Sequence, residues 1–197
     1  MSINLDEDIK ELLIGGKHYL QANDLEGFYD DYLAQQTEYE DLPVDFIGEI
    51  TDYLRSKGIY FEDYVNFVPK YACAAGGVPK QWLQGDTLII PSKIQYLHKG
   101  AFAEDDSLIK VDLSNIHKVG PYAFAYCIKL EELTVGASTQ LLEDCLYGVS
   151  SLETIYVPNE SVGKRILKDL PNADNHPDRK HYVYPDVVDE TTGEVYN

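Results

Sequence analysis

The sequence has few cysteines and no paired ones. Its 197 residues include Cys73, Cys127 and Cys145, and no Cys-x-x-Cys pair occurs. A disulfide framework and a structural zinc site both need more thiols, or thiols in close pairs. We therefore exclude these two classes and interpret the three cysteines as small buried side chains.

Long apolar segments are also missing from this sequence. No run approaches the roughly 18–20 apolar residues that a membrane-spanning helix needs. The first residues, MSINLDEDIKELL, are acidic, whereas a secretory signal has a basic region followed by an apolar one. We therefore expect a soluble protein in the cytoplasm of the cell that produces it, or of an infected cell.

Basic residues are scarce. The chain has 16 Lys and Arg against 34 Asp and Glu, a formal net charge of −18. Residues 1–66 alone hold 16 acids and 4 bases, so two thirds of the imbalance lies in one third of the chain. Such a charge repels nucleic acids and anionic membranes and attracts basic protein surfaces. We predict a protein partner with a basic surface, no direct nucleic-acid binding and no membrane binding.

The first third of the chain has the apolar spacing of amphipathic helices. The segments are residues 5–16, 23–36 and 42–58, with a shorter fourth candidate at 60–67. Pro43 at a first helical position and Gly58 just past the last one bound the third segment. Residues 1–66 are thus predicted to form an acidic helical domain.

From about residue 67 the sequence repeats with a step of 22 residues. Six apolar columns keep this step: Leu108, Leu130, Leu152; Val111, Leu133, Ile155; Leu113, Val135, Val157; Leu97, Val119, Leu141; Ala101, Ala123, Cys145; and Phe102, Phe124, Leu146. In L-x-x-V-x-L the last two apolar residues lie two positions apart, so they share one face of a short strand. Stacking such units buries continuous ladders, and stability then comes from contacts between neighbouring units.

The predicted fold is therefore α+β, with a helical N-terminal region capping a short solenoid that has a small parallel sheet. The solenoid is expected to span residues 67–173, starting with a degenerate half unit at 67–77 and ending with a capping helix at Ser161–Leu170. Residues 174–197 are predicted to be a C-terminal tail with only a weak hairpin signal, whose turn is Thr191-Thr192-Gly193.

The repeat resembles the short bacterial leucine-rich repeat called BspA-like. Its pattern is L-x-x-I-x-(I/L)-P-x-x-(I/V)-x-x-(I/V)-x-x-x-A-F-x-x-C, which LIIPSKIQYLHKGAF and VDLSNIHKVGPYAFAYC match. The resemblance covers roughly residues 67–170 and implies a solenoid that presents binding surface. It says little about function, because such repeats occur on surface proteins, in intracellular proteins and in phage or prophage products.

Motifs for catalysis or for cofactor and metal binding are not found in the sequence. LLIGGKHYL lacks the spacing and the hydroxyl of a phosphate-binding loop. His98 and His117 are expected in exposed repeat turns. HPDRKH, residues 176–181, offers two histidines and an aspartate, but in surroundings typical of a flexible tail. We predict a protein that is not an enzyme and has no cofactor or metal.

Acidic and tyrosine side chains are the candidate binding residues. Tyrosine buries a large area at a low entropic cost and is frequent at interfaces. The candidates in the first third are Asp30, Asp31, Tyr32, Glu38, Tyr39, Glu40, Asp41, Asp45, Glu49, Asp52 and Tyr53. Those on the open face of the predicted sheet are Asp112, Thr134 and Tyr156.

Two hypotheses about function follow from these candidates. In the first, the protein engages a basic partner through its acidic, tyrosine-rich N-terminal region. Its narrower form is a phage-encoded inhibitor that mimics nucleic acid and occupies the groove of a nucleic-acid-handling defence enzyme. In the second, the protein is a structural or adhesive leucine-rich-repeat protein, and the solenoid face is the binding surface.

Overall fold

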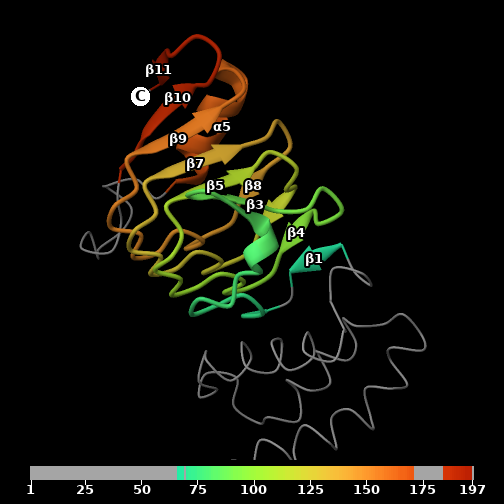
Figure 1. Cartoon of the computed structure of the whole chain (residues 1–197). Coiled ribbons are helices and arrows are strands. Elements are labelled where there is room, and N and C mark those ends of the chain that lie inside the picture. The colour runs from blue at the N-terminus through green and yellow to red at the C-terminus, as the bar shows by residue number, and fades with distance from the viewer. Residues whose placement is uncertain (1–65, 69, 171–183, 197) are drawn as a thin grey trace, which may run out of the picture.

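The computed structural model describes residues 66–68, 70–170 and 184–196 (Figure 1). These residues form a solenoid whose layers stack from strand β1 at one end to strands β10 and β11 at the other (Figure 1). The helices predicted for the first 65 residues lie outside the described residues, so the helical cap stays a prediction. No helix within the described residues is long and apolar enough to cross a membrane.

The larger sheet has seven strands in the order β11-β10-β9-β7-β5-β3-β2. Its parallel strands are β3 (Thr87–Ile89), β5 (Lys110–Leu113), β7 (Glu132–Val135), β9 (Thr154–Val157) and β10 (Asp186–Asp189). The outermost strands, β2 (Leu83–Gln84) and β11 (Val195–Tyr196), each pair antiparallel with their neighbour. Such short edge strands expose little unpaired backbone to edge-to-edge association.

The 22-residue step seen in the sequence sets the register of this sheet, because residues 22 apart pair across neighbouring strands. Val111 of β5 pairs with Leu133 of β7, which pairs with Ile155 of β9. Leu88 of β3 pairs with Val111 although the two lie 23 apart, so the extra residue of that unit falls outside the strand. Each strand from β5 to β9 alternates half-exposed and buried positions. The predicted parallel sheet is confirmed.

A second, four-stranded parallel sheet was not predicted. It consists of β1 (Phe67–Val68), β4 (Tyr96–Leu97), β6 (Lys118–Val119) and β8 (Gln140–Leu141), in that order. His98 follows β4 and His117 precedes β6, so both lie between strands, in the connections where they were expected, and His117 is exposed. Two-residue strands are too short to show the alternation of buried and exposed positions by which a strand is recognised.

The degenerate half unit predicted before the first full repeat is a layer of the solenoid. Strand β1 pairs with β4. The amides of Cys73 and Ala75 donate hydrogen bonds to the carbonyl oxygens of Ala101 and Ala103, at 2.9 and 2.8 Å. Phe67, which also ended the fourth predicted helical segment, is thus part of a strand and not of a helix.

The core is a stack of equivalent side chains from successive layers. The rings of Phe102 and Phe124 are fully buried and lie 3° from parallel, with centroids 5.3 Å apart. All three cysteines are buried, as predicted. The Cys127 thiol donates a hydrogen bond to the carbonyl oxygen of Phe102 at 3.0 Å. Burial raises the pKa of Cys127 and of Cys145 to about 12, so both thiols are protonated at neutral pH.

Helix α5 (Glu160–Asp169) covers the end of the last full layer, where the capping helix was predicted. Asn159 is its N-cap and accepts a hydrogen bond from the amide of Val162 at 3.1 Å. Arg165 donates to the carbonyl oxygens of Ala137 and Thr139, each at 2.9 Å. These bonds tie the helix to the preceding layer.

Residues 184–196 add a hairpin to the larger sheet. Strand β10 pairs in parallel with β9, and the chain then turns back into β11. Asp189 is only 6% exposed and accepts hydrogen bonds from the amides of Thr191 and Thr192, at 2.9 and 2.8 Å, and from the Tyr196 hydroxyl at 3.0 Å. The weak hairpin signal in the sequence thus corresponds to an ordered last layer of the sheet.

Candidate functional site

The outward side chains of the larger sheet form two rows, which together we call the sheet face. One row is Ile89, Asp112, Thr134, Tyr156 and Val188. The other is Thr87, Lys110, Glu132, Thr154 and Asp186. Both rows follow the strand register, so neighbouring side chains come from strands about 4.8 Å apart. The repeat therefore creates a continuous ladder of side chains at the surface.

Three candidate residues from the sequence are adjacent in this ladder. Asp112 pairs with Thr134, and Thr134 pairs with Tyr156. All three side chains are half-buried. The Asp112 carboxylate accepts hydrogen bonds from the amide of Ser114, at 2.8 Å, and from its hydroxyl, which fixes the carboxylate at the end of β5. The three residues lie on the open face where they were expected, and their role in binding stays a prediction.

A lysine between two carboxylates occupies the second row. Lys110 Nζ lies 3.3 Å from the Glu132 carboxylate and 3.8 Å from that of Asp86. Its hydrogen bond to Glu132 raises the pKa of Lys110, and the charges of Glu132 and Asp86 raise it further. Pairs at this degree of exposure contribute little to stability. Their main effect is to orient the side chains of the row.

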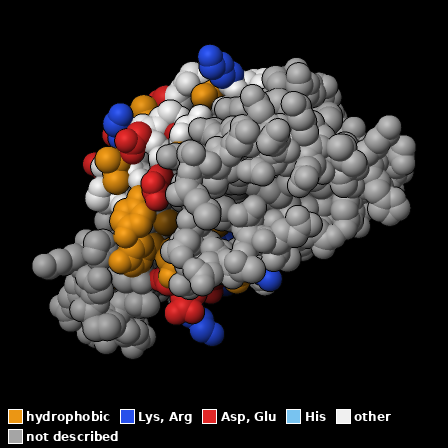
Figure 2. Space-filling model, turned by 90° about the horizontal axis from the view of Figure 1, so that it is seen from below, with side chains coloured by type: hydrophobic (Ala, Val, Ile, Leu, Met, Phe, Trp, Pro, Cys, Tyr) orange, Lys and Arg blue, Asp and Glu red, His pale blue; other side chains and the backbone are white. Residues whose placement is uncertain are grey.

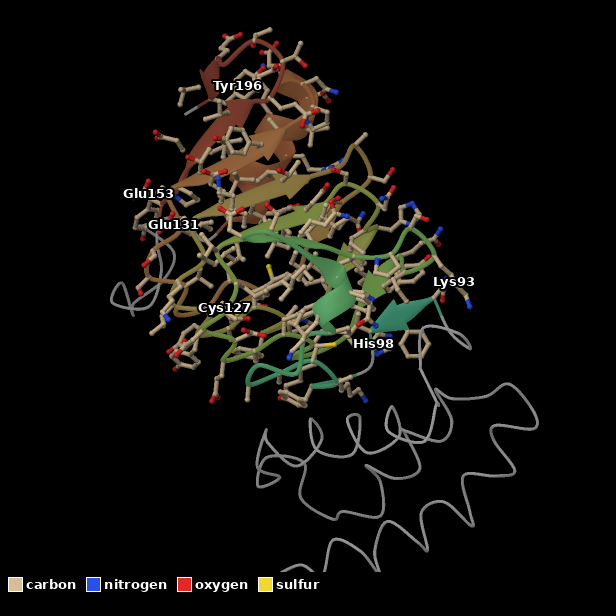
Figure 3. All side chains as sticks on the ribbon, in the orientation of Figure 1. Lys93, His98, Cys127, Glu131, Glu153 and Tyr196 are labelled. Carbon is tan, nitrogen blue, oxygen red and sulfur yellow. The ribbon has the colours of Figure 1, made fainter. Side chains whose placement is uncertain are left out.

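Two exposed glutamates extend the acidic character of the sheet face. Glu131 and Glu153 stand just before β7 and β9, and the amide of Glu153 donates to the Glu131 carbonyl oxygen at 2.9 Å. Figure 3 shows them one above the other, where their strands begin. The sheet face and these strand ends together hold six carboxylates against the single ammonium group of Lys110. The carboxylates are those of Asp86, Asp112, Glu131, Glu132, Glu153 and Asp186.

The acidic and tyrosine candidates of the first third lie outside the described residues. They are Asp30, Asp31, Tyr32, Glu38, Tyr39, Glu40, Asp41, Asp45, Glu49, Asp52 and Tyr53. The histidines of segment 176–181 also lie outside them. In the part of the chain that the structure describes, no three His, Cys, Asp or Glu side chains are close enough to hold one metal ion.

The part of the sheet face that comes from β10 was not predicted from the sequence. Asp186 and Val188 face outward there, on either side of the buried Val187. The alternation in PDVVD was a usable signal. It was missed because Val187 follows Ile155, its register partner, by 32 residues and not by 22. Helix α5 takes up part of this longer connection.

Tyrosines are exposed on the side of the solenoid formed by the Ala-Phe turns. Tyr122 and Tyr126 are 36% and 41% exposed, and each ring makes an edge-on contact with Tyr147. The Tyr122 hydroxyl donates to the Asp144 carboxylate at 3.2 Å, and the charge of Asp144 raises the pKa of Tyr122. Figure 2 shows hydrophobic side chains beside acidic ones on the described part of the face seen from below.

Comparison with known proteins identifies the repeat. Residues 83–172 match the sequence model of a BspA type leucine-rich repeat region of six copies. Neither the curated proteins nor the solved structures gave a significant match. The matched residues contain the layers from β2 to α5, where the 22-residue step sets the strand register. Residues 83–172 of this chain therefore match the BspA-type leucine-rich repeat, as the repeat pattern predicted.

Proposed function

We propose that the protein binds a partner protein with a basic surface on its sheet face, without catalysing a reaction. Leucine-rich repeat solenoids serve in protein–protein interaction or adhesion, because stacked repeats offer extended surface. The observation that carries the proposal is the row Asp112–Thr134–Tyr156, which three consecutive strands hold in direct register.

The chemistry of this row suits an interface. Tyr156 is half-buried and its register neighbours are the short side chains of Thr134 and Val188. An aromatic ring held in this way loses little freedom on binding and offers a hydroxyl at its tip. Such rings are common among the residues that dominate binding energy. Tyr156 is thus the proposed anchor, and the smaller neighbours leave room for a partner side chain beside it.

Charge complementarity argues for a basic partner. The sheet face and the strand ends beside it hold six carboxylates against one lysine, on a chain whose formal net charge is −18. Carboxylates at the rim of an interface speed the approach of a basic protein more than they tighten the final complex. We therefore expect association that weakens as salt concentration rises.

Residues 1–66 are the competing location for the binding surface. Their 16 acids and 4 bases favour it, and they lie almost entirely outside the described residues. The narrower hypothesis of a phage-encoded nucleic-acid mimic gains no support from the family match, which identifies the architecture alone. It stays a hypothesis about this segment, and one experiment separates the two locations.

The experiment is photo-crosslinking in cells that produce the full chain. The photoreactive analogue p-benzoylphenylalanine replaces one tyrosine at a time: Tyr156 on the sheet face, Tyr39 in the acidic segment, or Tyr126 on the turn side as a matched exposed control. We expect one basic protein to be captured at Tyr156 and not at Tyr126. Capture at Tyr39 alone would move the binding surface to the acidic segment and overturn the proposal.

The captured partner, once purified, allows a quantitative test. Tyr156→Ala is expected to weaken its binding about tenfold or more, as truncation of an interface anchor does. Tyr126→Ala removes the same atoms from an exposed tyrosine on the turn side and is expected to change binding less than about twofold. Equal effects of the two substitutions would contradict a role of the sheet face.

A further inference from the structure

A groove with a different charge lies on the second sheet, away from the sheet face. Three lysines, Lys70, Lys99 and Lys118, line it together with Tyr96 and His98. Its volume is about 420 Å³, which falls in the range of ligand-binding sites in proteins. We call it the lysine groove. Figure 3 shows His98 beside β1, at the opposite side of the solenoid from Glu131 and Glu153.

The repeat builds the walls of the lysine groove. Tyr96 of β4 and Lys118 of β6 are register partners, and both side chains point outward. The ring of His98 stacks on Phe67 of the layer below, with centroids 4.6 Å apart. The three lysines come from three consecutive layers, because Lys70 follows β1, Lys99 follows β4 and Lys118 lies in β6.

Backbone forms part of the floor of the groove. The amide of Gly120 donates to the Leu97 carbonyl oxygen at 2.8 Å. A Cβ at Gly120 would lie 2.6 Å from that oxygen and 2.8 Å from the carbonyl carbon of His98. No other residue fits at this point, so the groove passes over bare backbone between the flanking side chains.

The charge of the groove is opposite to that of the chain. Among the described residues, three lysines line it and no Asp or Glu does, although the whole protein has a formal net charge of −18. Lysine ammonium groups are compact, strongly hydrated charges that donate hydrogen bonds to carboxylates in many orientations. The three lysines must therefore attract an anionic ligand more strongly than the acidic remainder of the protein repels it.

We propose that the lysine groove binds a short, extended acidic segment of a partner protein. The first and third layers of a parallel sheet lie about 10 Å apart, which three residues of extended chain span. A run of Asp or Glu residues can therefore span the three layers that carry Lys70, Lys99 and Lys118. A nucleic acid fits less well, because its charge of about one per 1.7 Å is repelled more strongly by an acidic protein. This inference is independent of the function proposed for the sheet face.

The test uses the full-length protein and a fluorescein-labelled hexaglutamate peptide. Binding is measured by fluorescence anisotropy at an ionic strength of about 20 mM and again at about 300 mM. We expect binding at the lower salt concentration, and an approximately tenfold weaker affinity when Lys99→Gln and Lys118→Gln are combined. The matched control combines Lys80→Gln and Lys129→Gln, two exposed lysines outside the groove. The control changes the net charge equally and is expected to bind as the unaltered protein does.

Several results would overturn the proposal. They are no binding of the peptide at low salt, an equal loss in the two double variants, or stronger binding of a DNA oligonucleotide than of the peptide. Thermal unfolding followed by circular dichroism checks whether both variants remain folded. A loss of binding through unfolding is thereby distinguished from a loss of charge.

Zero-length crosslinking with a carbodiimide identifies the occupant directly. We expect the hexaglutamate peptide to be joined to Lys70, Lys99 or Lys118. Joining of these lysines to carboxylates of the chain itself, in place of the peptide, would show that the groove is filled from within and would overturn the proposal. Joining of the peptide chiefly to other lysines would contradict it as well.

Discussion

The ring of Tyr71 lies against the backbone of Gly100 in the next layer of the solenoid. A Cβ at Gly100 would be 2.0 Å from the ring. Tyr126 and Gly148, one layer apart, have the same relationship at 2.6 Å. Both tyrosines have left-handed backbone conformations, with φ of 56° and 58°. The turn side is therefore closed by rings that need a glycine beneath them.

Replacement of Gly100 is predicted to be costly for two separable reasons. Its φ of +64° disfavours any side chain, and the Tyr71 ring fills the space of a Cβ. Gly85 has a similar φ of +68° and open space around it. We expect Gly85→Ala to cost about 1 kcal/mol, and Gly100→Ala about 1–3 kcal/mol more, measured by urea denaturation. Equal costs would refute the close contact. Adding Tyr71→Ala to Gly100→Ala is expected to restore part of the lost stability.

The stack of Phe102 on Phe124 provides a second prediction. Phe124→Ala is expected to cost about 3–5 kcal/mol, because it leaves a cavity in a fully buried column. Phe124→Leu is expected to cost less than about 1.5 kcal/mol, since it keeps most of the volume. Leu146 occupies the equivalent position of the next repeat, 22 residues after Phe124, so a leucine is already present in this column. Chemical denaturation of both variants checks the order, and a larger loss for the leucine variant would contradict it.

The buried thiols provide a third prediction. Cys73, Cys127 and Cys145 are all buried, and burial raises the pKa of the last two to about 12. We expect none of the three to react with a thiol reagent such as Ellman's reagent at about pH 8 in the folded protein. All three are expected to react after denaturation. Reaction of even one thiol per chain before unfolding would show that its layer opens locally.

The sequence predicted the parallel sheet because six columns of apolar residues keep one step. Residues 22 apart, such as Val111 and Leu133, are register partners. This register places equivalent buried side chains of successive layers on top of one another. The second sheet could not be predicted, because each of its strands has two residues, and β4, β6 and β8 have only one buried position each. The placement of Asp112, Thr134 and Tyr156 on one face followed from the same step.

The lysine groove was not predicted because it depends on contacts between residues that belong to different columns. Lys70, Lys99 and Lys118 share no 22-residue step, and only the fold brings them together. One partial signal existed. Leu97, Val119 and Leu141 form an inward column, so the preceding Tyr96 and Lys118 had to point outward. Periodic patterns thus identify ladders of equivalent residues. A site formed by residues from different columns can be located only in the folded structure.

Asp189 is predicted to make the stability of the C-terminal hairpin depend on pH. The amide of Thr192 above all, and then the amide of Thr191 and the Tyr196 hydroxyl, hold the pKa of Asp189 below its ordinary value of 3.8. A carboxyl group with a lowered pKa in the folded state stabilises that state above its ordinary pKa. This contribution is lost as pH falls toward the folded-state pKa.

The measurement is thermal unfolding between about pH 7 and about pH 2.5, for the unaltered chain, Asp189→Asn and Asp186→Asn. We expect Asp189→Asn to lower the melting temperature at neutral pH, because the amide lacks the charge that the hairpin amides and Tyr196 stabilise. The difference from the unaltered chain is expected to shrink as Asp189 becomes protonated. Asp186, exposed on the same strand, serves as the control, and its variant is expected to follow the unaltered chain at every pH. A difference for Asp189→Asn that stays constant down to the lowest pH would show that the charge of Asp189 does not stabilise the hairpin.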